Sequence, residues 1–313
     1  MSNNATFSHS AISHSAISHS AIRPCAKLTV RERSFRLSRP ANIALCFGNY
    51  AKAILMRISL SPRSRVLEFG CGPGTNILKL EASSPEIVVF VDKDFKCIKR
   101  ASQRYRERPA ETTLANVQFF CLDFLHLSSA AIVCRHSRNA FPFDCVLAFY
   151  SLQYIAESQE KSLIFFRNCF SILEPGGVIL GIMPNAQRLL MATQHPGSLF
   201  TIEGLQQFTD KTLTSGIPYT FQISGEEAYH EYTLQLSDMV QAMDGLFEVK
   251  QITSVLNFLL EKEIEFPELC ASLFSCIVCN KFNRPGSQWK FSRDEMCLVD
   301  LYDIVVLSKI RSV

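Results

Sequence analysis

Residues 66–74 read VLEFGCGPG, and this stretch decides the fold. An apolar run ends at Phe69, and glycines follow at positions 70, 72 and 74. Glycines after a strand let the backbone approach a ligand closely, and the helix beyond them would present its N-terminus to that ligand. The GxGxG spacing differs from the GxGxxG of dinucleotide-binding folds, and Glu68 precedes the first glycine. The stretch therefore predicts a strand, a ligand-binding loop and a helix.

Short apolar runs alternate with helix-like segments on both sides of this loop. The expected strands are residues 65–69, 87–91, 117–121, 143–149 and 178–182, and the expected helices are 49–58, 75–82, 94–107 and 158–173. Buried strands that alternate with helices of ten to fifteen residues are typical of parallel βαβ units. Residues 124–142, between two of the strands, are expected to form a longer surface loop.

After residue 184 the pattern changes. Residues 219–223 are expected to form a strand and 231–243 a helix, while 247–252 and 301–307 are expected to close the sheet as further strands. The sequence thus predicts an α/β domain over 41–313 with a mostly parallel sheet of about seven strands. Residues 185–245 form an insertion over the C-terminal edge, where open α/β sheets bind ligands.

Residues 1–40 carry a different signal. Residues 8–22 are three tandem copies of Ser-His-Ser-Ala-Ile, a period too short for a solenoid unit. His-rich tracts sometimes bind metal, but a polar repeat without an apolar face favours a disordered tail. The basic residues that follow, up to residue 40, are compatible with two interpretations. They contact a polyanion, or they belong to a solvated tail.

Composition excludes several classes of protein. The 313 residues are 47% hydrophobic and 19% charged with a net charge of +3, which favours a globular chain over one that coats nucleic acid by charge alone. Apolar runs are too short for a membrane span, and the start lacks the pattern of a signal peptide. The 12 cysteines are therefore expected to be reduced thiols. Cys276 and Cys279 form the one CxxC, for which core packing is favoured over zinc because no second ligand pair follows.

Polar residues follow further strands of the series. Asp92 ends the second strand, 18 residues after Gly74, and is placed to accept from both hydroxyls of a ribose. Asp123 follows the third strand, and Pro175-Gly176-Gly177 precedes the fifth. Together with the glycine loop, these features resemble the class I S-adenosylmethionine-dependent methyltransferases. By that resemblance the glycines lie against the methionine part of the cofactor, Asp92 holds the ribose and Asp123 meets the adenine.

Within that superfamily the chain resembles the eukaryotic mRNA cap guanine-N7 methyltransferases over about residues 45–310. The family's Asn-Asn-Trp-x-Lys segment corresponds to residues 48–52 (GNYAK), and its Gln-Phe-x-x-His-Tyr segment to 149–154 (FYSLQY). Residues 181–185 (GIMPN), 219–221 (YTF), 231–234 (EYTL) and 301–306 (LYDIVV) resemble further family segments.

The resemblance implies roles residue by residue. It implies a cofactor site made of Lys52, Gly70, Gly72, Asp92, Asp123, Phe149 and Tyr154, with Phe149 acting mainly through its backbone. It implies a cap-guanine pocket made of Asn49, Tyr150, Gln153, Glu231 and Tyr302. Glu231, Tyr302 and Gln153 are the expected catalytic residues. Guanine N7 has a free lone pair and loses no proton on methylation, so neither a general base nor a metal is expected.

The chain departs from the family at several positions. Gly48 replaces the first Asn, Pro73 replaces a Lys after the Gly-Cys-Gly triplet, and Gln153 replaces a His. A glutamine still forms hydrogen bonds but cannot titrate. The plainer alternatives remain open at this point. Tyr150 and Tyr154 would merely pack under the insertion, Glu231 would be a first-turn helix acid, and Tyr302 would be an ordinary strand residue.

The leading expectation is methyl transfer from S-adenosylmethionine to N7 of a GpppN RNA cap, in the nucleus. The resemblance implies capped RNA as the partner, with other capping enzymes or the transcription machinery beside it, and no membrane. One alternative is a class I methyltransferase that acts on a small molecule or a protein. The other is a non-catalytic subunit that binds the cap or the cofactor, which Pro73 and Gln153 suggest.

Overall fold

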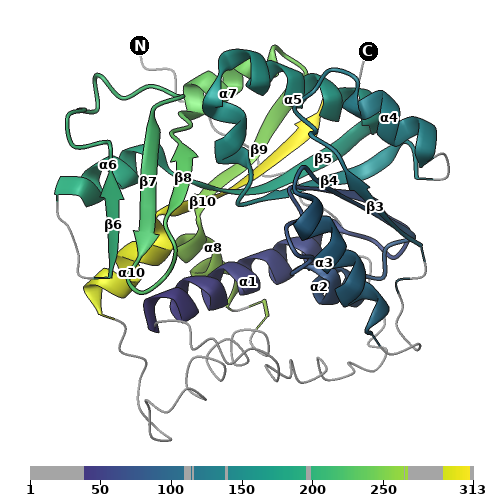
Figure 1. Cartoon of the computed structure of the whole chain (residues 1–313), viewed down its shortest axis with the longest axis horizontal. Coiled ribbons are helices and arrows are strands. Elements are labelled where there is room, and N and C mark those ends of the chain that lie inside the picture. Colours follow the sequence, from purple (N-terminus) through teal and green to yellow (C-terminus); the bar gives the residue numbers. More distant parts are fainter. Residues whose placement is uncertain are drawn as a thin grey trace, which may run out of the picture. The chain divides into compact units, whose positions relative to one another are not determined.

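A seven-stranded sheet forms the centre of the described chain (Figure 1). This computed structural model describes residues 39–108, 114, 116–137, 140–194, 199–263, 265–266 and 292–310, all within the unit Leu37–Val313. The N-terminal repeats, nearly all of the expected tail at 1–40, and the pair Cys276 and Cys279 lie outside the described residues. The described cysteines are free thiols.

The sheet has the order β3-β2-β1-β4-β5-β10-β9. Its strands are β1 (Arg65–Phe69), β2 (Ile87–Asp92), β3 (Val117–Cys121), β4 (Phe143–Phe149), β5 (Leu173–Pro184), β9 (Phe247–Ser254) and β10 (Tyr302–Lys309). The first five run parallel, and β10 is antiparallel to both β5 and β9. Because β1 to β5 run parallel, Phe69, Asp92, Cys121, Phe149 and Pro184 all end at one edge. The expected mostly parallel α/β sheet is confirmed.

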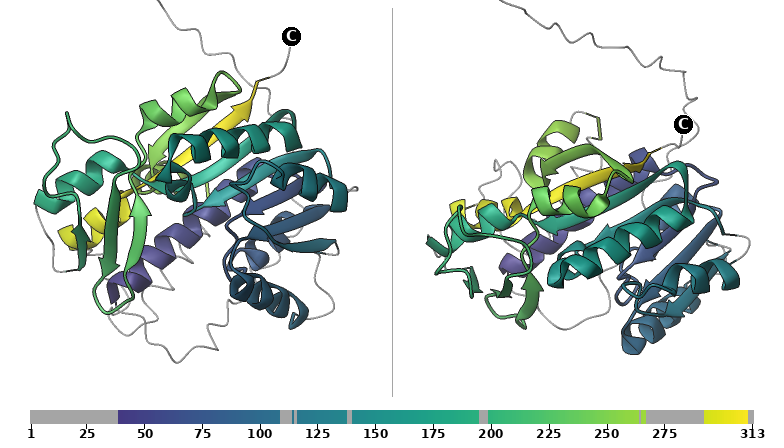
Figure 2. Two further views of the ribbon diagram at one scale, coloured as in Figure 1. Left: turned by 45° about the horizontal axis from the view of Figure 1, so that its top comes forward. Right: turned by 90° about the horizontal axis from the view of Figure 1, so that it is seen from above.

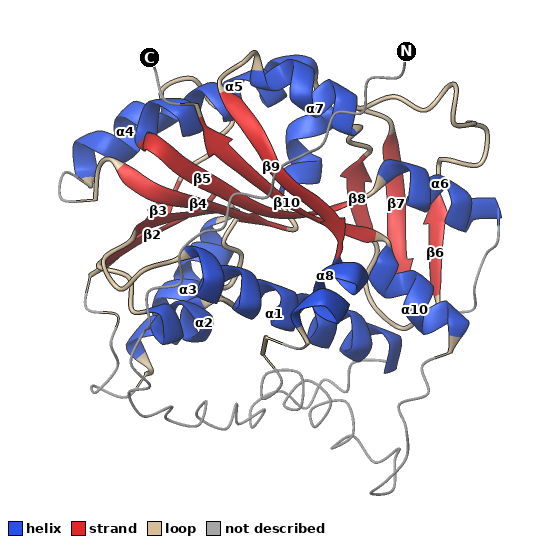
Figure 3. Cartoon of the chain, turned by 180° about the vertical axis from the view of Figure 1, so that it is seen from behind, coloured by secondary structure: helices blue, strands red, loops and turns tan. Residues whose placement is uncertain are grey.

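Helices cover both faces of this sheet (Figure 3). One face carries α4 (Ser129–His136), α5 (Gln159–Ile172) and α7 (Leu236–Met243). The other carries α1 (Arg39–Ser59), α2 (Ile77–Ser83), α3 (Phe95–Arg106) and α8 (Val255–Lys262). The other helices in the described residues are η1 (Leu152–Glu157), α6 (Ala186–Gln194) and α10 (Arg293–Asp300). None of the described helices combines the length and the apolar character needed to cross a bilayer.

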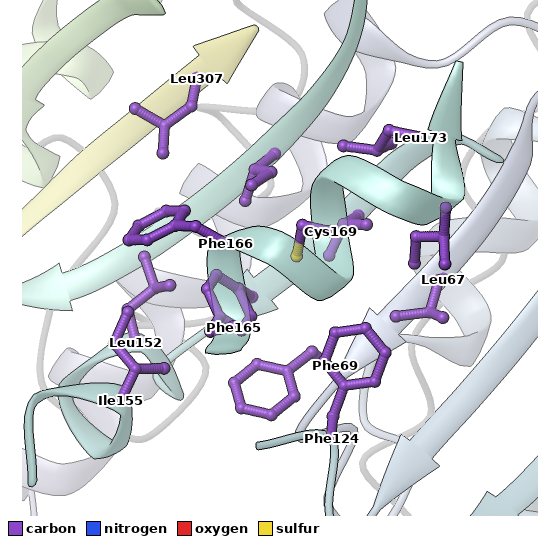
Figure 4. Close-up of a cluster of buried hydrophobic side chains, with 14 of the residues drawn as sticks. Leu67, Phe69, Phe124, Leu152, Ile155, Phe165, Phe166, Cys169, Leu173 and Leu307 are labelled. Carbon is purple, nitrogen blue, oxygen red and sulfur yellow. The ribbon is translucent and has the colours of Figure 1, made fainter. Parts of the chain in front are cut away.

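Aromatic rings fill much of the core between the sheet and α5 (Figure 4). The Phe69 ring lies 5.0 Å from that of Phe165 and 5.8 Å from that of Phe124, measured between centroids. All three side chains are buried. Large apolar side chains on both faces explain why the strands read as nearly continuous apolar runs, as parallel strands with two covered faces do. This packing fixes the end of β1, from which the glycine loop starts.

A separate three-stranded sheet lies between β5 and β9 in the sequence. It consists of β6 (Phe200–Glu203), β7 (Pro218–Ile223) and β8 (Tyr229–Tyr232), in that order. Its buried residues, among them Phe200 and Phe221, share an apolar cluster with Leu298 and Leu301, which places this sheet beside the start of β10 (Figure 2). The described residues of α6 and of the small sheet β6–β8 therefore lie at the same edge as the ends of the parallel strands, whereas α7 covers a face of the main sheet.

Three expected elements differ from the structure. The helix expected at 49–58 begins at Arg39, and the loop expected at 124–142 contains α4, whose Ala130 and Val133 are buried three residues apart. Two helical turns with that single apolar pair are too short a signal for a periodic pattern. The helix expected to begin at Glu231 begins at Leu236, because residue 231 pairs with Tyr219 across β7 and β8.

Candidate functional site

The glycine loop has the backbone conformation that its sequence predicts. Gly70, Gly72 and Gly74 have φ values of +64°, +53° and +73°, a region that side chains with a Cβ rarely adopt. A Cβ added at Gly70 would lie 2.8 Å from the Cβ of Ser151, whereas one added at Gly72 would meet no atom within 4 Å. The backbone at Gly72 therefore faces open space, into which a ligand can approach.

Asp92 joins this loop to the end of β2. Its Oδ2 accepts a hydrogen bond from the backbone N–H of Gly72 at 2.8 Å, and its Oδ1 accepts from that of Asp94 at 2.9 Å. The carboxylate is half-buried, and each of its oxygens can accept a second hydrogen bond. Asp92 thus holds the loop in place and keeps acceptor capacity for a ligand.

A buried charged pair lies under the loop. Lys52 of α1 and Glu68 of β1 are 5% and 2% exposed. Burial lowers the pKa of Lys52 to about 8, and the charge of Glu68 opposes that shift. Burial also raises the pKa of Glu68 to about 7, while Asn76, which donates to Glu68 Oε1 at 2.6 Å, and Lys52 oppose it. Glu68 Oε2 is buried and has no hydrogen-bond partner among the described residues.

The donors and acceptors here fit the cofactor that the sequence predicts. A methionine moiety offers an ammonium and a carboxylate, which suit the orphaned Glu68 Oε2 and the Lys52 ammonium respectively. Asp92 would accept hydrogen bonds from the ribose hydroxyls of the cofactor. The backbone of Gly70 and Gly72 would lie against its methionine part. Asp123 is exposed just after β3, and its Oδ1 accepts from the backbone N–H of Leu125 at 2.9 Å.

A second group of side chains, which we term the Glu231 cluster, consists of Tyr150, Gln153, Tyr219, Glu231 and Tyr302. Glu231 Oε2 accepts from the Tyr219 hydroxyl at 2.6 Å, and its Oε1 accepts from Gln153 Nε2 at 2.9 Å. The two aromatic rings of Tyr150 and Tyr302 meet edge to face, with centroids 5.2 Å apart. The residue after β4 and residues of η1, β7, β8 and β10 thus meet at one place.

Burial dominates the electrostatics of the Glu231 cluster. Glu231 is 7% exposed, and its burial raises the pKa of the carboxyl group, while the hydrogen bonds from Tyr219 and Gln153 oppose that shift. Burial also raises the pKa of Tyr154 to about 12, with the charge of Glu231 as the next cause. Tyr154 therefore lies near Glu231.

Tyr150 joins the two groups of side chains. Its ring lies 5.4 Å from Lys52 Nζ, and its backbone carbonyl accepts from Gln153 Nε2 at 3.1 Å. A Cβ built on Gly48 would fall 2.1 Å from the Tyr150 hydroxyl oxygen, so the phenol occupies the space above that glycine. Asn49, the next residue, has a buried Oδ1 without a partner among the described residues.

The remaining expected residue, Phe149, ends β4 with its side chain buried in the core, so its backbone is what it can offer to a ligand. Sequence reasoning missed Tyr219 as a site residue. Its position opposite Glu231 is decided by the register of β7 and β8, although the Tyr-x-Phe segment that contains it was a usable signal. Lys79 was missed as well. Burial and then the charge of Lys52 lower the pKa of Lys79 to about 7, which places it close to the buried pair.

Comparisons with known proteins show which family and fold the chain resembles. Residues 11–309 match the model of the family described as mRNA (guanine-N(7))-methyltransferase domain, a range that begins earlier than the motifs at 45–310 indicated. The mRNA cap guanine-N(7) methyltransferase of Caenorhabditis elegans is 28% identical over 133 residues, which are 42% of this chain and 34% of that protein. The Schizosaccharomyces pombe protein of the same name is 27% identical over 145 residues, 45% and 38% of the two chains. The alignments thus span well under half the length of these relatives.

A solved structure supports the fold. The crystal structure of a S-adenosylmethionine-dependent methyltransferase from Clostridium acetobutylicum is similar with a TM-score of 0.50 and 13% identity, over 86% of this chain and 92% of that one. At that identity the likeness shows the fold alone, which is the class I methyltransferase fold. The family and the fold together imply S-adenosylmethionine as the cofactor. Because the match covers nearly the whole chain, this protein belongs to the mRNA (guanine-N(7))-methyltransferase domain family.

Proposed function

We propose that this protein transfers a methyl group from S-adenosylmethionine to N7 of the guanine in a GpppN RNA cap. One observation carries the proposal, namely the buried carboxylate of Glu231, which Tyr219 and Gln153 hold beside the rings of Tyr150 and Tyr302. Family membership supports it independently. Asn49, Tyr150, Gln153, Glu231 and Tyr302 are proposed to bind the guanine, and Lys52, Gly70, Gly72, Asp92, Asp123, Phe149 and Tyr154 the cofactor.

The chemistry of the Glu231 cluster suits guanine. The N1 and N2 hydrogens of guanine are donors on one edge, and a carboxylate accepts both, whereas adenine offers no such pair. Each oxygen of Glu231 already accepts one hydrogen bond and has a lone pair left for a second. Aromatic rings such as Tyr150 and Tyr302 offer surfaces for an unstacked base, as in readers of single-stranded RNA. The carboxylate therefore selects guanine over adenine, and the aromatic rings fix the orientation of the base plane.

The orientation of Gln153 adds a further acceptor. Its Nε2 faces two acceptors, the Tyr150 carbonyl and Glu231 Oε1, which determines which end of the amide carries the nitrogen. Its Oε1 is consequently left buried without a partner among the described residues. An acceptor held in this way would take a donor hydrogen from guanine. The histidine that the family resemblance expects here would have offered a titratable ring instead.

Catalysis in this arrangement rests on position and charge. S-adenosylmethionine, when bound, supplies a methyl group activated by its sulfonium. Guanine N7 attacks with a free lone pair, so the residues of the site need not remove a proton. They hold the purine in line, and effective molarity supplies much of the acceleration. Positive charge grows on the purine towards the transition state, and the Glu231 carboxylate stabilises it because burial limits competition from water.

The test uses Glu231→Gln. The new amide group would oppose either the Gln153 donor or the N1 and N2 hydrogens of guanine, and the negative charge is lost. We expect turnover on capped RNA to fall by about 10²–10³, as for loss of one oxyanion-type contact, with weaker cap binding and unchanged affinity for S-adenosylmethionine. Glu227→Gln, an exposed change four residues away, is the matched control and should leave methylation unchanged.

Methylation of capped against uncapped RNA and of small-molecule or protein acceptors identifies the acceptor class. Methyl transfer only to an uncapped acceptor would overturn the cap as the substrate and favour a different acceptor. Normal cap methylation by Glu231→Gln would remove Glu231 from the base site. Binding of the cofactor without methyl transfer to any acceptor would favour the alternative of a non-catalytic binding subunit. The proposal implies a nuclear location and contact with other capping enzymes or the transcription machinery, since mRNA caps are completed on nascent transcripts.

A further inference from the structure

The exposed side of α3 carries a row of cations. Lys96, Lys99, Arg100 and Arg106 are all exposed, and an exposed Lys93 precedes Asp94, the N-cap residue of the helix. Spacings of three and four residues put neighbours on one side of a helix, while Ile98 and Ala101 on the other side are buried. We call these five cations the basic face of α3. Within the described part of the chain, no ion pair to an acidic side chain involves any of them.

This arrangement opposes the stability of the helix. The first turn has no acidic residue, and Lys96 lies there against the positive end of the helix dipole. Lys96 and Arg100, four residues apart, repel each other, as do Arg100 and Arg104. The charge of Arg100, after burial, lowers the pKa of Arg104, and Glu107 at the end of the helix opposes this. The helix dipole favours Arg106 in the last turn, and the Asp94 carboxylate caps the first turn, but neither accounts for Lys96, Lys99 and Arg100. These three cations are exposed and are therefore available to an anion.

The start of α3 lies at the sheet edge that carries the proposed cofactor site, because Phe95 follows Asp92, the last residue of β2, by three residues. Lys52 lies under the Tyr150 ring, and its charge lowers the pKa of Lys79 on α2. The charge of Arg104 on α3 also lowers the pKa of Lys79, so the two side chains are neighbours. Ile77 of α2 and Ile98 of α3 belong to one buried apolar cluster, so the two helices cover the same face of the sheet. An RNA strand whose capped end lies at the sheet edge where α3 begins can therefore continue along α3.

Phe95 adds an aromatic surface to the same helix. It begins α3, its side chain is 65% exposed, and cations at positions 93 and 96 flank it. Exposed aromatic rings among cations are the usual means of holding single-stranded nucleic acid, because every base has a face that can stack. A helix of 12 residues is about 18 Å long, enough to lie beside several phosphates of one strand.

We propose that the basic face of α3, together with Phe95, binds the RNA strand that follows the cap. The inference rests on the proposed function and specifies its substrate as a capped RNA chain rather than an isolated cap. The phosphates would contact Lys96, Lys99 and Arg100 without reading sequence, and one base would stack on Phe95. The surface thus supplies affinity for the chain, while the Glu231 cluster selects the guanine.

The test compares two double variants of the full chain with equal loss of charge. Lys96→Gln/Arg100→Gln alters the basic face, and Arg63→Gln/Lys250→Gln removes two exposed cations elsewhere. Binding of a fluorescent 20-nucleotide single-stranded RNA is measured by anisotropy from 50 to 200 mM salt. Each phosphate contact contributes about 0.7 to the slope of log affinity against log salt, so the first variant should lower that slope by about 1.4. Its affinity should fall about ten-fold, and its melting temperature should not fall, because repulsion is relieved.

Methylation measurements separate this proposal from the function on which it rests. For the α3 variant we expect KM to rise about ten-fold on a capped 20-nucleotide RNA and to stay unchanged on the dinucleotide GpppG. Equal slopes and affinities for the two double variants would overturn the α3 surface, even if cap methylation is normal. Failure of the unaltered protein to methylate either capped substrate would overturn the proposed function, whereas the binding data would still decide whether α3 holds RNA.

Phe95→Ala provides a second, uncharged test. It should weaken RNA binding by about ten-fold, since stacking on an aromatic side chain contributes roughly 1–3 kcal/mol per base, without changing the salt slope. Leu127→Ala, which removes a side chain of similar exposure at 67%, is its control. Unchanged RNA affinity in Phe95→Ala would mean that Phe95 does not contribute to the binding surface and that the cations act without it.

Discussion

Tyr150 adopts a left-handed backbone conformation with φ of +55°, which costs a residue with a side chain about 1–2 kcal/mol. Its backbone N–H donates to the Ile182 carbonyl at 2.8 Å, and its carbonyl accepts from Gln153. These bonds and the packing on Tyr302 hold the strained conformation. Strain of this kind concentrates at binding sites, because it aims a side chain where a relaxed strand would not. In this chain it turns the ring, just after the end of β4, towards Lys52 and the Tyr302 ring.

At the residue scale, Tyr219→Phe tests how Glu231 is held. The Tyr219 hydroxyl favours the charged form of Glu231, so its loss should raise the pKa of that carboxyl further. If the ionised form is active, the acid limb of the pH–rate profile moves to higher pH. Turnover at neutral pH should fall about ten-fold, the equivalent of 1.4 kcal/mol from one lost hydrogen bond to a charged group.

Tyr229→Phe is the matched control for this change, because Tyr229 lies on the same strand as Glu231 but is 51% exposed. It should leave the pH profile in place. A profile that does not move in Tyr219→Phe would mean that the hydroxyl does not set the charge state of Glu231, whatever happens to stability.

Asp92→Ala tests the cofactor site. The variant loses the acceptor for ribose hydroxyls and the bond that fixes Gly72, so affinity for S-adenosylmethionine should fall at least ten-fold. Asp94→Ala is the control: its side chain caps α3 by accepting from Lys96 N–H at 2.8 Å, so it should cost about 1 kcal/mol of stability and leave cofactor affinity intact. Titration calorimetry on both variants measures the difference, and equal affinities would remove Asp92 from the cofactor site.

At the scale of elements, Gly48 decides how closely α1 approaches the end of β4. A glycine inside a helix ordinarily costs about 1 kcal/mol relative to alanine, so its presence needs a reason. That reason is the Tyr150 phenol, which fills the position a Cβ would take. The resemblance expects Asn at position 48 and Phe at position 150. Here a smaller helix residue and a larger ring, with its extra hydroxyl, fit each other.

Gly48→Ala should therefore lower stability although the helix propensity improves, because the Tyr150 ring must move. In a Tyr150→Phe background the nearest remaining contact would be 3.1 Å from the ring carbon instead of 2.1 Å from the hydroxyl oxygen, so the same change should be tolerated far better. We expect a coupling free energy of about 1 kcal/mol between the two positions in a double-mutant cycle of thermal unfolding. Additive effects would contradict the contact.

The position of Glu231 in strand β8 changes the role that its side chain can have. A carboxylate in the first turn of a helix would interact with the helix dipole and with water, whereas Glu231 is paired in a strand and buried against two donors. The helical pattern begins only at Leu236, and its buried Met239, Ala242 and Met243 have helical spacing. The helix-start alternative for Glu231 is therefore wrong.

At the scale of the whole molecule, the cofactor should stabilise the chain through linkage. Bound at 100 times its dissociation constant, a ligand of the native state adds about 2.7 kcal/mol, and each kcal/mol moves the melting temperature of a large domain by roughly 2–4 °C. We expect a rise of about 5–10 °C with S-adenosylmethionine. Asp92→Ala, with ten-fold weaker binding, should retain about half of it. A rise of equal size in that variant would mean that the ligand binds elsewhere.

The sequence by itself determined the sheet and the cofactor half of the proposed site. Apolar runs, the glycines at 70, 72 and 74, and Asp92 are local signals, because each lies within one strand and the turn that follows it. Parallel strands bring such turns to one edge in any doubly wound sheet, so their proximity needs no knowledge of packing. The sequence did not predict the helix α4 or the start of α1, because short or irregular apolar spacing gives a weak periodic signal.

Only the tertiary structure decided how the Glu231 cluster is assembled. Gln153 and Glu231 are 78 residues apart, and Tyr219 faces Glu231 because of the register between two short strands. That Gln153 pairs through Nε2 and keeps Oε1 unpaired, and that Gly48 admits the Tyr150 ring, follow from contacts between segments that no local pattern relates. The physical reason is that propensity and periodicity act over one element. Hydrogen bonds between distant segments depend instead on how the packed core sets those elements against each other.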